Sequence, residues 1–194
     1  MEWNDRYMTL FREAAERFLT NPHASTERFF LPDETDFLSS IGMKTEEMHH
    51  LIADYCTLGE PSPSTALLVA AQRRSFFLTT QRGISGNAAE VKAASLPAET
   101  EEFQEIPYLP RLIRKAEATL FGTLDKALHF PDAKDRDFLR THGSIHPADF
   151  LALVSAARGD RQKIVSAVLA AMAAKPAAPA TPAPTPQQGE LGLQ

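Results

Sequence analysis

Cysteine is nearly absent from this chain: Cys56 is the single one among 194 residues, so no disulfide can form within it. A lone thiol fits a reducing compartment. The N-terminus lacks a basic segment followed by an apolar run, which would be the pattern of a signal peptide. No stretch approaches the ~20 apolar residues of a membrane-spanning helix. We therefore expect a cytoplasmic protein with no membrane partner.

Basic residues are also fewer than acidic ones. The chain has 20 Lys and Arg against 25 Asp and Glu, which gives a net charge of -5. Because no helix-turn-helix pattern occurs either, we predict no nucleic-acid partner. The Walker phosphate loop, GxGxxG, HExxH and GxSxG motifs are all missing. The sequence therefore indicates no cofactor.

What the chain does contain is an internal repeat at a spacing of about one hundred residues. A duplication of this length indicates one helical unit built twice. We expect Phe37 and Phe138 in matching core positions, and Gly42 and Gly143 at matching helix ends. The two copies read Pro32-Asp33-x-x-Asp36-Phe37-Leu38-x-x-x-Gly42 and Pro131-Asp132-x-x-x-x-Asp137-Phe138-Leu139-x-x-x-Gly143.

Apolar residues recur at helical spacing through both halves, and no segment shows convincing strand alternation. The clearest helical stripe is Leu109, Leu112, Ile113, Ala116, Leu120 and Leu124. We therefore predict an all-α fold of two tandem repeats of about four helices each. The first helical unit would span 1–82, a linker or lid 83–107, the second unit 108–174 and a disordered Pro/Ala-rich tail 175–194.

The predicted tail consists largely of Pro, Ala and Thr, which offer little surface to bury. We predict that it is disordered and dispensable for folding. Near its end, Gln188, Leu191 and Leu193 loosely resemble the short motif by which bacterial proteins bind the DNA sliding clamp. The usual terminal aromatic residue of that motif is missing. The tail is a candidate tether for a protein partner.

The second unit carries a further resemblance. The matching residues are Leu109-Pro110-Arg111-Leu112-Ile113-x-Lys115-Ala116, Ala118-Thr119-Leu120-x-Gly122-x-Leu124, Asp135-x-x-Phe138-Leu139, Gly143, Pro147-x-x-Phe150-Leu151 and Ile164-Val165. On these residues, Tyr108 to about Met172 resembles a family of small bacterial domains of unknown function. The resemblance implies an α-helical domain and a bacterial source, with no established activity. Relatives usually carry a cysteine around Phe130-Pro131-Asp132, and this chain has none there.

Four possible metal or thiol ligands lie on the helix predicted to begin at Thr45. His50 and Asp54 are spaced i, i+4, and His49 and Cys56 are spaced i, i+7. All three residue types bind metals, but at ~100° per residue the two pairs point in different directions. The apolar face of the helix places His50 and Asp54 in solvent. It places His49 and Cys56 at its border, with Cys56 as an inert thiol near a helix end that disfavours a thiolate.

Basic residues form two clusters that could bind an anion. Arg73 and Arg74 lie on the helix predicted before the linker, and Arg111, Arg114 and Lys115 follow the acidic run within the linker. Arginine side chains bind carboxylate and phosphate groups well. The alternative is a solvated helix face that pairs with the acidic linker.

Aspartates recur in both copies of the repeat, as Asp33, Asp36, Asp132 and Asp137. Paired carboxylates can act as acid and base, but they also cap short helices. Capping is favoured because a structural role should appear in both copies, whereas catalysis needs only one.

The sequence favours a non-catalytic helical module that binds a partner protein or a small anionic ligand. The alternative is an enzyme, or a metal or thiol sensor, that uses His49, Cys56 and nearby arginines in a cleft between the units. Geometry separates the two hypotheses. The enzyme hypothesis gains if Cys56 and His49 line one cavity together with Arg73 or Arg111.

Overall fold

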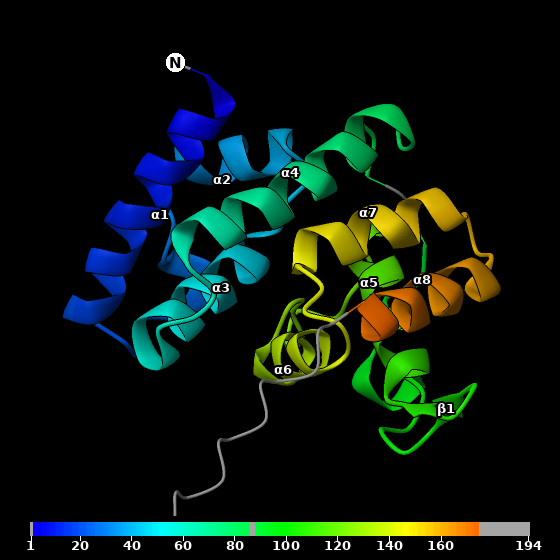
Figure 1. The fold of residues 1–194 in the computed structure, drawn as a ribbon. Helices are drawn as coiled ribbons and strands as arrows, with labels where there is room; N and C mark the ends of the chain where they lie inside the picture. The colour runs from blue at the N-terminus through cyan, green and yellow to red at the C-terminus, as the bar shows by residue number, and fades with distance from the viewer. Residues whose placement is uncertain (1, 86–87, 175–194) are drawn as a thin grey trace, which may run out of the picture.

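Eight α-helices build the part of the chain that the structure describes, residues 2–85 and 88–174 of a computed structural model (Figure 1). They are α1 Trp3–Thr20, α2 Pro32–Ser40, α3 Thr45–Leu58, α4 Pro63–Thr79, α5 Leu109–Phe121, α6 Ala133–Thr141, α7 Pro147–Ala157 and α8 Arg161–Ala174. The predicted all-α fold class is confirmed. None of these helices combines the length and apolar character of a membrane span. The predicted tail, with Gln188, Leu191 and Leu193, lies outside the described residues.

The helices α1 to α4 form the first unit around one core. α1 buries Tyr7, Phe11 and Phe18 on the face that packs against α3, as the helical spacing of its apolar residues predicts. Phe37 of α2 belongs to the same core. A 3-10 helix, η1 Thr26–Arg28, connects α1 with α2.

The long helix α4 belongs to two cores. Ala66 and Ala70 pack into the core of the first unit, whereas Val69 and Phe76 lie in the core that α5 to α8 form. Phe138 of α6 is buried in this second core, as predicted. In Figure 1 α4 runs between α1 and α7, and it packs against both. This shared helix holds the two units together and fixes the geometry of their junction.

The connection between the units packs on α5. Val91 and Leu96 are buried against Ala118 and Leu124, and Val91 forms a parallel bridge with Leu124. Its remaining elements are the 3-10 helix η2 Ala93–Ser95 and two antiparallel strands, β1 Glu102–Phe103 and β2 Ile106–Pro107. The sequence did not indicate these strands because two residues are too few to show alternation.

The paired glycines of the repeat have the same local role. Gly42 and Gly143 both follow the second helix of their unit, with left-handed φ angles of +76° and +99°. A Cβ atom at Gly42 would collide with Phe77, and one at Gly143 with Ala171. Phe77 and Ala171 lie on the fourth helix of the respective unit. These correspondences support the predicted tandem repeat, which stays a prediction for the units as wholes.

The Pro-Asp pairs of the repeat do not correspond. Pro32 is the first residue of α2, whereas Pro131 precedes Asp132, the N-cap residue of α6. The spacing from Pro-Asp to Asp-Phe-Leu differs by two residues between the copies, and this explains the offset. The acidic residues that do correspond are Glu34 and Asp135, each the third residue of its helix, and both are buried.

Candidate functional site

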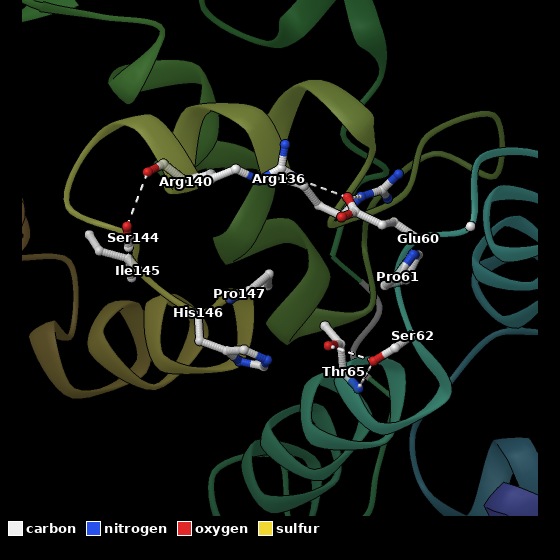
Figure 2. A pocket seen from close by; sticks show the side chains of 11 residues that line it. Glu60, Pro61, Ser62, Thr65, Arg136, Arg140, Ser144, Ile145, His146 and Pro147 are labelled. Carbon is white, nitrogen blue, oxygen red and sulfur yellow. Dashed lines mark hydrogen bonds and ion pairs between the residues drawn. The ribbon is translucent and has the colours of Figure 1, made fainter. Parts of the chain in front are cut away.

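A cavity of about 440 Å³ lies where the turn between α3 and α4 meets the turn between α6 and α7 (Figure 2). We call it the junction cavity. Its volume is within the range of small-molecule sites, about 300–1,000 Å³. It is lined by Gly59, Glu60, Pro61, Ser62 and Thr65 of the first unit and by Arg136, Arg140, Ser144, Ile145, His146 and Pro147 of the second. Both units therefore contribute polar side chains to one concave site.

Arg136, Arg140 and Glu60 form one wall of the cavity, which we call the arginine wall. The two arginines are spaced i, i+4 on α6, so their side chains leave the helix on the same side. Arg140 Nη2 lies 2.7 Å from Glu60 Oε2, and Arg136 Nε lies 3.6 Å from the same atom. Figure 2 shows both arginine side chains reaching toward the Glu60 carboxylate. Glu60 is 53% exposed, whereas Arg136 is 7% exposed and its Nε has no hydrogen-bond acceptor in the described structure.

The N-terminal ends of α4 and α7 form the other wall, the helix-end wall. Their N-cap residues are Ser62 and His146, and each is followed by proline. The Thr65 amide donates to Ser62 Oγ at 3.2 Å, and the Ala148 amide donates to His146 Nδ1 at 3.2 Å. Because Nδ1 accepts, Nε2 is the nitrogen of His146 that can donate to a ligand. Two positive helix ends, hydroxyl groups and an imidazole therefore meet at one cavity.

Asp54 of α3 holds Arg136 in place across the junction. Arg136 Nη1 donates to Asp54 Oδ2 and to the Pro131 carbonyl, both at 2.8 Å. His129 Nε2 lies 3.1 Å from the same Asp54 oxygen. Burial alone would raise the pKa of Asp54, but the hydrogen bonds from His129 and Arg136 hold it below the ordinary 3.8. Asp54 is therefore ionised at neutral pH and fixes one edge of the guanidinium group.

The prediction that His50 and Asp54 face solvent is wrong. His50 stacks on His129, with the ring centroids 4.7 Å apart, and its Nε2 donates to the Lys126 carbonyl at 2.9 Å. Burial lowers the pKa of His50. The error has a physical cause, because α3 is covered on two sides: α1 packs on one, and the segment before α6 covers the other. A single apolar stripe reveals only the first of these.

His49 and Cys56 face the first core. The His49 ring meets Phe18 and Phe29 edge-on, with centroids 5.7 Å and 4.7 Å away. Cys56 Sγ lies 3.8 Å from the Ala15 carbonyl, and burial raises the pKa of this thiol. Neither residue lines the junction cavity or any of three further cavities in the described part of the chain. Within the same residues, no three His, Cys, Asp or Glu side chains are arranged to hold a metal ion.

The five basic residues predicted as an anion site do not converge. Each has a partner of its own: Arg73 with Gln81, Arg74 over the Trp3 ring, Arg111 with the Pro97 carbonyl, Arg114 with Glu117, and Lys115 with Asp132 and Asp135. Arg73 lines a different cavity of about 410 Å³, beside Gly122 and the start of α3. The arginines that share a cavity, Arg136 and Arg140, are on α6.

Lys115 is the centre of a buried charge network. Its side chain is 2% exposed, and its Nζ donates to Asp132 and, at 2.6 Å, to Asp135 Oδ2. The Tyr108 hydroxyl donates to Asp135 Oδ1 at 2.7 Å. The corresponding carboxylate of α2 is also paired with a cation. Because both units contain such a pair, and this one lines none of the four cavities, we assign the network a structural role.

The capping prediction for the recurring aspartates holds at one position. Asp132 caps α6, because its Oδ1 accepts the Asp135 amide at 2.9 Å. Asp33, Asp36 and Asp137 lie inside their helices with exposed side chains, so they are not N-cap residues.

Sequence reasoning missed Glu60, Arg136, Arg140 and His146. Some of their local signals are visible, since the two arginines have helical spacing and His146 precedes a proline, which is typical of a helix start. The packing of α4 against α7 brings these residues together, although Glu60 lies about 80 positions before the other three in the chain. No pattern within either segment could show that packing.

Comparison with known proteins identifies no relative. No protein-family model, no curated protein and no solved structure matches this chain. The resemblance of Tyr108 to Met172 to a bacterial family therefore stays a prediction.

Proposed function

We propose that the protein is a non-catalytic helical module that binds a small organic anion in the junction cavity. The observation that carries this proposal is the convergence of Arg136, Arg140 and two helix N-termini on one cavity. Guanidinium groups and helix N-termini both favour anions. Among the residues that line the cavity, Glu60 is the single acidic one.

Arg136 gives the most specific support. A polar atom that is buried without a hydrogen-bond partner costs stability, and such atoms are rare in folded proteins. Arg136 Nε is one of them, although Asp54 and the Pro131 carbonyl satisfy Nη1 of the same group. A ligand carboxylate at the arginine wall would accept from Nε, and binding would remove this cost.

The polar groups of the cavity favour binding over catalysis. A nucleophilic serine needs a base within hydrogen-bond reach. Ser62 Oγ instead contacts the hydroxyls of Ser64 and Thr65, at 2.9 Å and 3.0 Å. The imidazole of His146 caps α7 through Nδ1. The alternative of an enzyme or thiol sensor needs His49 and Cys56 in a cavity with an arginine, and the described cavities do not provide that arrangement.

Thermal unfolding of the full chain in the presence of citrate tests the proposal. For a Kd of about 1 mM, about 10 mM citrate would stabilise the protein by about 1.4 kcal/mol and raise the Tm by about 3–5 °C. Arg140→Gln should remove most of this rise, because it takes away the exposed half of the arginine wall.

The matched control is Arg161→Gln, which changes an exposed arginine of α8 outside the cavity and should keep the full rise. Sodium chloride at equal ionic strength controls for general screening. An equal rise in wild type and Arg140→Gln, or no rise in wild type, would contradict the proposal.

A further inference from the structure

The Glu60 carboxylate lies close to both guanidinium groups of the arginine wall. Its Oε2 lies 2.7 Å from Arg140 Nη2 and 3.6 Å from Arg136 Nε, and all three residues line the cavity. Asp54 pairs with Arg136 Nη1 and does not line the cavity. The arginine wall therefore already holds one carboxylate, and the protein supplies it.

We infer that Glu60 is an internal substitute for the ligand, and that the ligand is a small di- or tricarboxylate. One carboxylate of the ligand displaces Glu60 from Arg136 and Arg140, and another reaches Thr65 and His146 on the helix-end wall. This inference rests on the proposed function of the junction cavity. It adds the chemical class of the ligand and a side chain that sets its affinity.

The displacement of Glu60 is feasible because this residue lies in an exposed turn. It belongs to the segment between α3 and α4, and its side chain is 53% exposed, so rotation into water breaks no buried contact. Ion pairs at such exposure contribute little to stability. Arg136 does not move with it, because Asp54 and the Pro131 carbonyl hold its Nη1.

The helix-end wall favours a second carboxylate over a phosphate. Phosphate sites at helix N-termini present several free backbone amides, often in glycine-rich loops. Here the first residue of both α4 and α7 is proline, which has no N–H group. The N-cap side chains Ser62 and His146 already accept the Thr65 and Ala148 amides. Ser62 Oγ also donates to Thr65 Oγ1. What remains is the Thr65 hydroxyl, an imidazole N–H and two helix dipoles, which suit the fewer oxygens of a carboxylate.

The cavity is large enough for a ligand with more than one acidic group. Its volume of about 440 Å³ far exceeds the ~30 Å³ that a water molecule occupies in the liquid, so a single carboxylate on the arginine wall would leave most of it to solvent. In Figure 2 the arginine wall and the helix-end wall lie on different sides of the cavity. A ligand with two or three carboxylates can contact both walls at once.

Isothermal titration calorimetry on the full chain tests the role of Glu60. Citrate, succinate and inorganic phosphate are titrated into wild type, Glu60→Gln, Glu60→Gln/Arg140→Gln and the control Glu90→Gln. Glu90 is an exposed glutamate outside the cavity, so its substitution changes the net charge equally. We expect Glu60→Gln to bind citrate and succinate roughly tenfold more tightly than wild type, because the competing carboxylate is gone. The double variant should lose this gain, and Glu90→Gln should match wild type.

The results distinguish the role of Glu60 from the proposed anion binding in the junction cavity. If citrate binds wild type but no more tightly to Glu60→Gln, Glu60 is not a substitute for the ligand, while the proposed function stands. If neither carboxylate binds wild type or Glu60→Gln, the proposed function fails. If phosphate binds Glu60→Gln as tightly as citrate does, the carboxylate class is overturned. Unchanged circular dichroism and Tm of each variant establish that a lost signal reflects binding rather than folding.

Discussion

In both units, the third residue of the second helix is acidic and pairs with a basic side chain. The two ion pairs differ in how deeply they are buried. In the first unit Arg17 pairs with Glu34 through two hydrogen bonds of 2.9 Å and 3.0 Å, and Arg17 is 33% exposed. In the second unit Lys115, 2% exposed, pairs with Asp135, which is fully buried. Each carboxylate also accepts the backbone amide of its helix's N-cap residue. Both units therefore contain this ion pair, but the pair of the second unit is more deeply buried than that of the first.

The difference decides how much each unit depends on its ion pair. Breaking a partly solvated pair costs less because water can replace the lost partner, whereas breaking a fully buried pair leaves an uncompensated charge. Lys115 serves two carboxylates, those of Asp132 and Asp135. Burial and the neighbouring Asp132 raise the pKa of Asp135, although Lys115 and Tyr108 act in the opposite direction. The second unit should therefore be the more sensitive one.

The largest effect is expected from Lys115→Met. It leaves Asp132 and Asp135 without their cation and should lower the free energy of unfolding by about 3–5 kcal/mol, measured by urea denaturation. The matched change Arg17→Met should cost only about 1–2 kcal/mol, because the side chain is partly solvated. Equal losses in the two variants would show that the depth of burial does not distinguish the units.

The paired glycines should give the next largest effect. At Gly143 a Cβ atom would lie 2.7 Å from the backbone of Ala171, so Gly143→Ala should cost about 2–4 kcal/mol of unfolding free energy from strain and overpacking. Gly42→Ala should cost about 1–3 kcal/mol, because it meets the Phe77 side chain instead. Gly159→Ala is the control: its φ is +85° but nothing lies within 4 Å. If Gly159→Ala lowers the free energy of unfolding as much as the other two substitutions do, the contacts of Gly42 with α4 and of Gly143 with α8 do not contribute to the loss.

A smaller, pH-dependent effect is expected at the junction. Asp54→Asn should cost about 2–3 kcal/mol near pH 6, because Arg136 and His129 lose a charged acceptor. The folded pKa of Asp54 lies below the unfolded value, so its contribution is present above the ordinary 3.8 and disappears as the pH falls through the folded pKa. The stability difference between wild type and variant should therefore shrink as the pH falls below 3.8. Asp36→Asn, an exposed control, should show no comparable trend.

Much of the fold could be predicted because its signals are local. The Ser62-Pro63 start of α4 and the Asp160 cap of α8 depend on neighbouring residues, and both are present. The environment of His50 could not be predicted, since it depends on a stack with His129, almost 80 residues further along. The correspondence of the buried Glu34 with Asp135 was not predicted. Aligning the two Pro-Asp pairs shifts α2 against α6 by two residues from their structural correspondence.

The junction cavity could not be predicted either, because it also depends on contacts between residues that are distant in the sequence. Glu60 and Arg140 are 80 residues apart, and they meet because α4 packs against α7. Each short segment shows only an ordinary turn or an ordinary amphipathic helix. Candidate sites chosen from the sequence instead favoured residues that are neighbours along one helix, such as Arg73 and Arg74, and these point to different partners in the fold.

Amide chemical-shift mapping would locate the bound anion on the protein. The ¹⁵N-labelled full chain is titrated with citrate at constant ionic strength. We predict that the largest shifts occur at amides around the cavity, in particular those of Glu60, Thr65, Arg140 and Ile145. Largest shifts around Gly122, in the cavity that Arg73 lines, or no saturable shifts at all, would contradict the assignment of the junction cavity as the anion site.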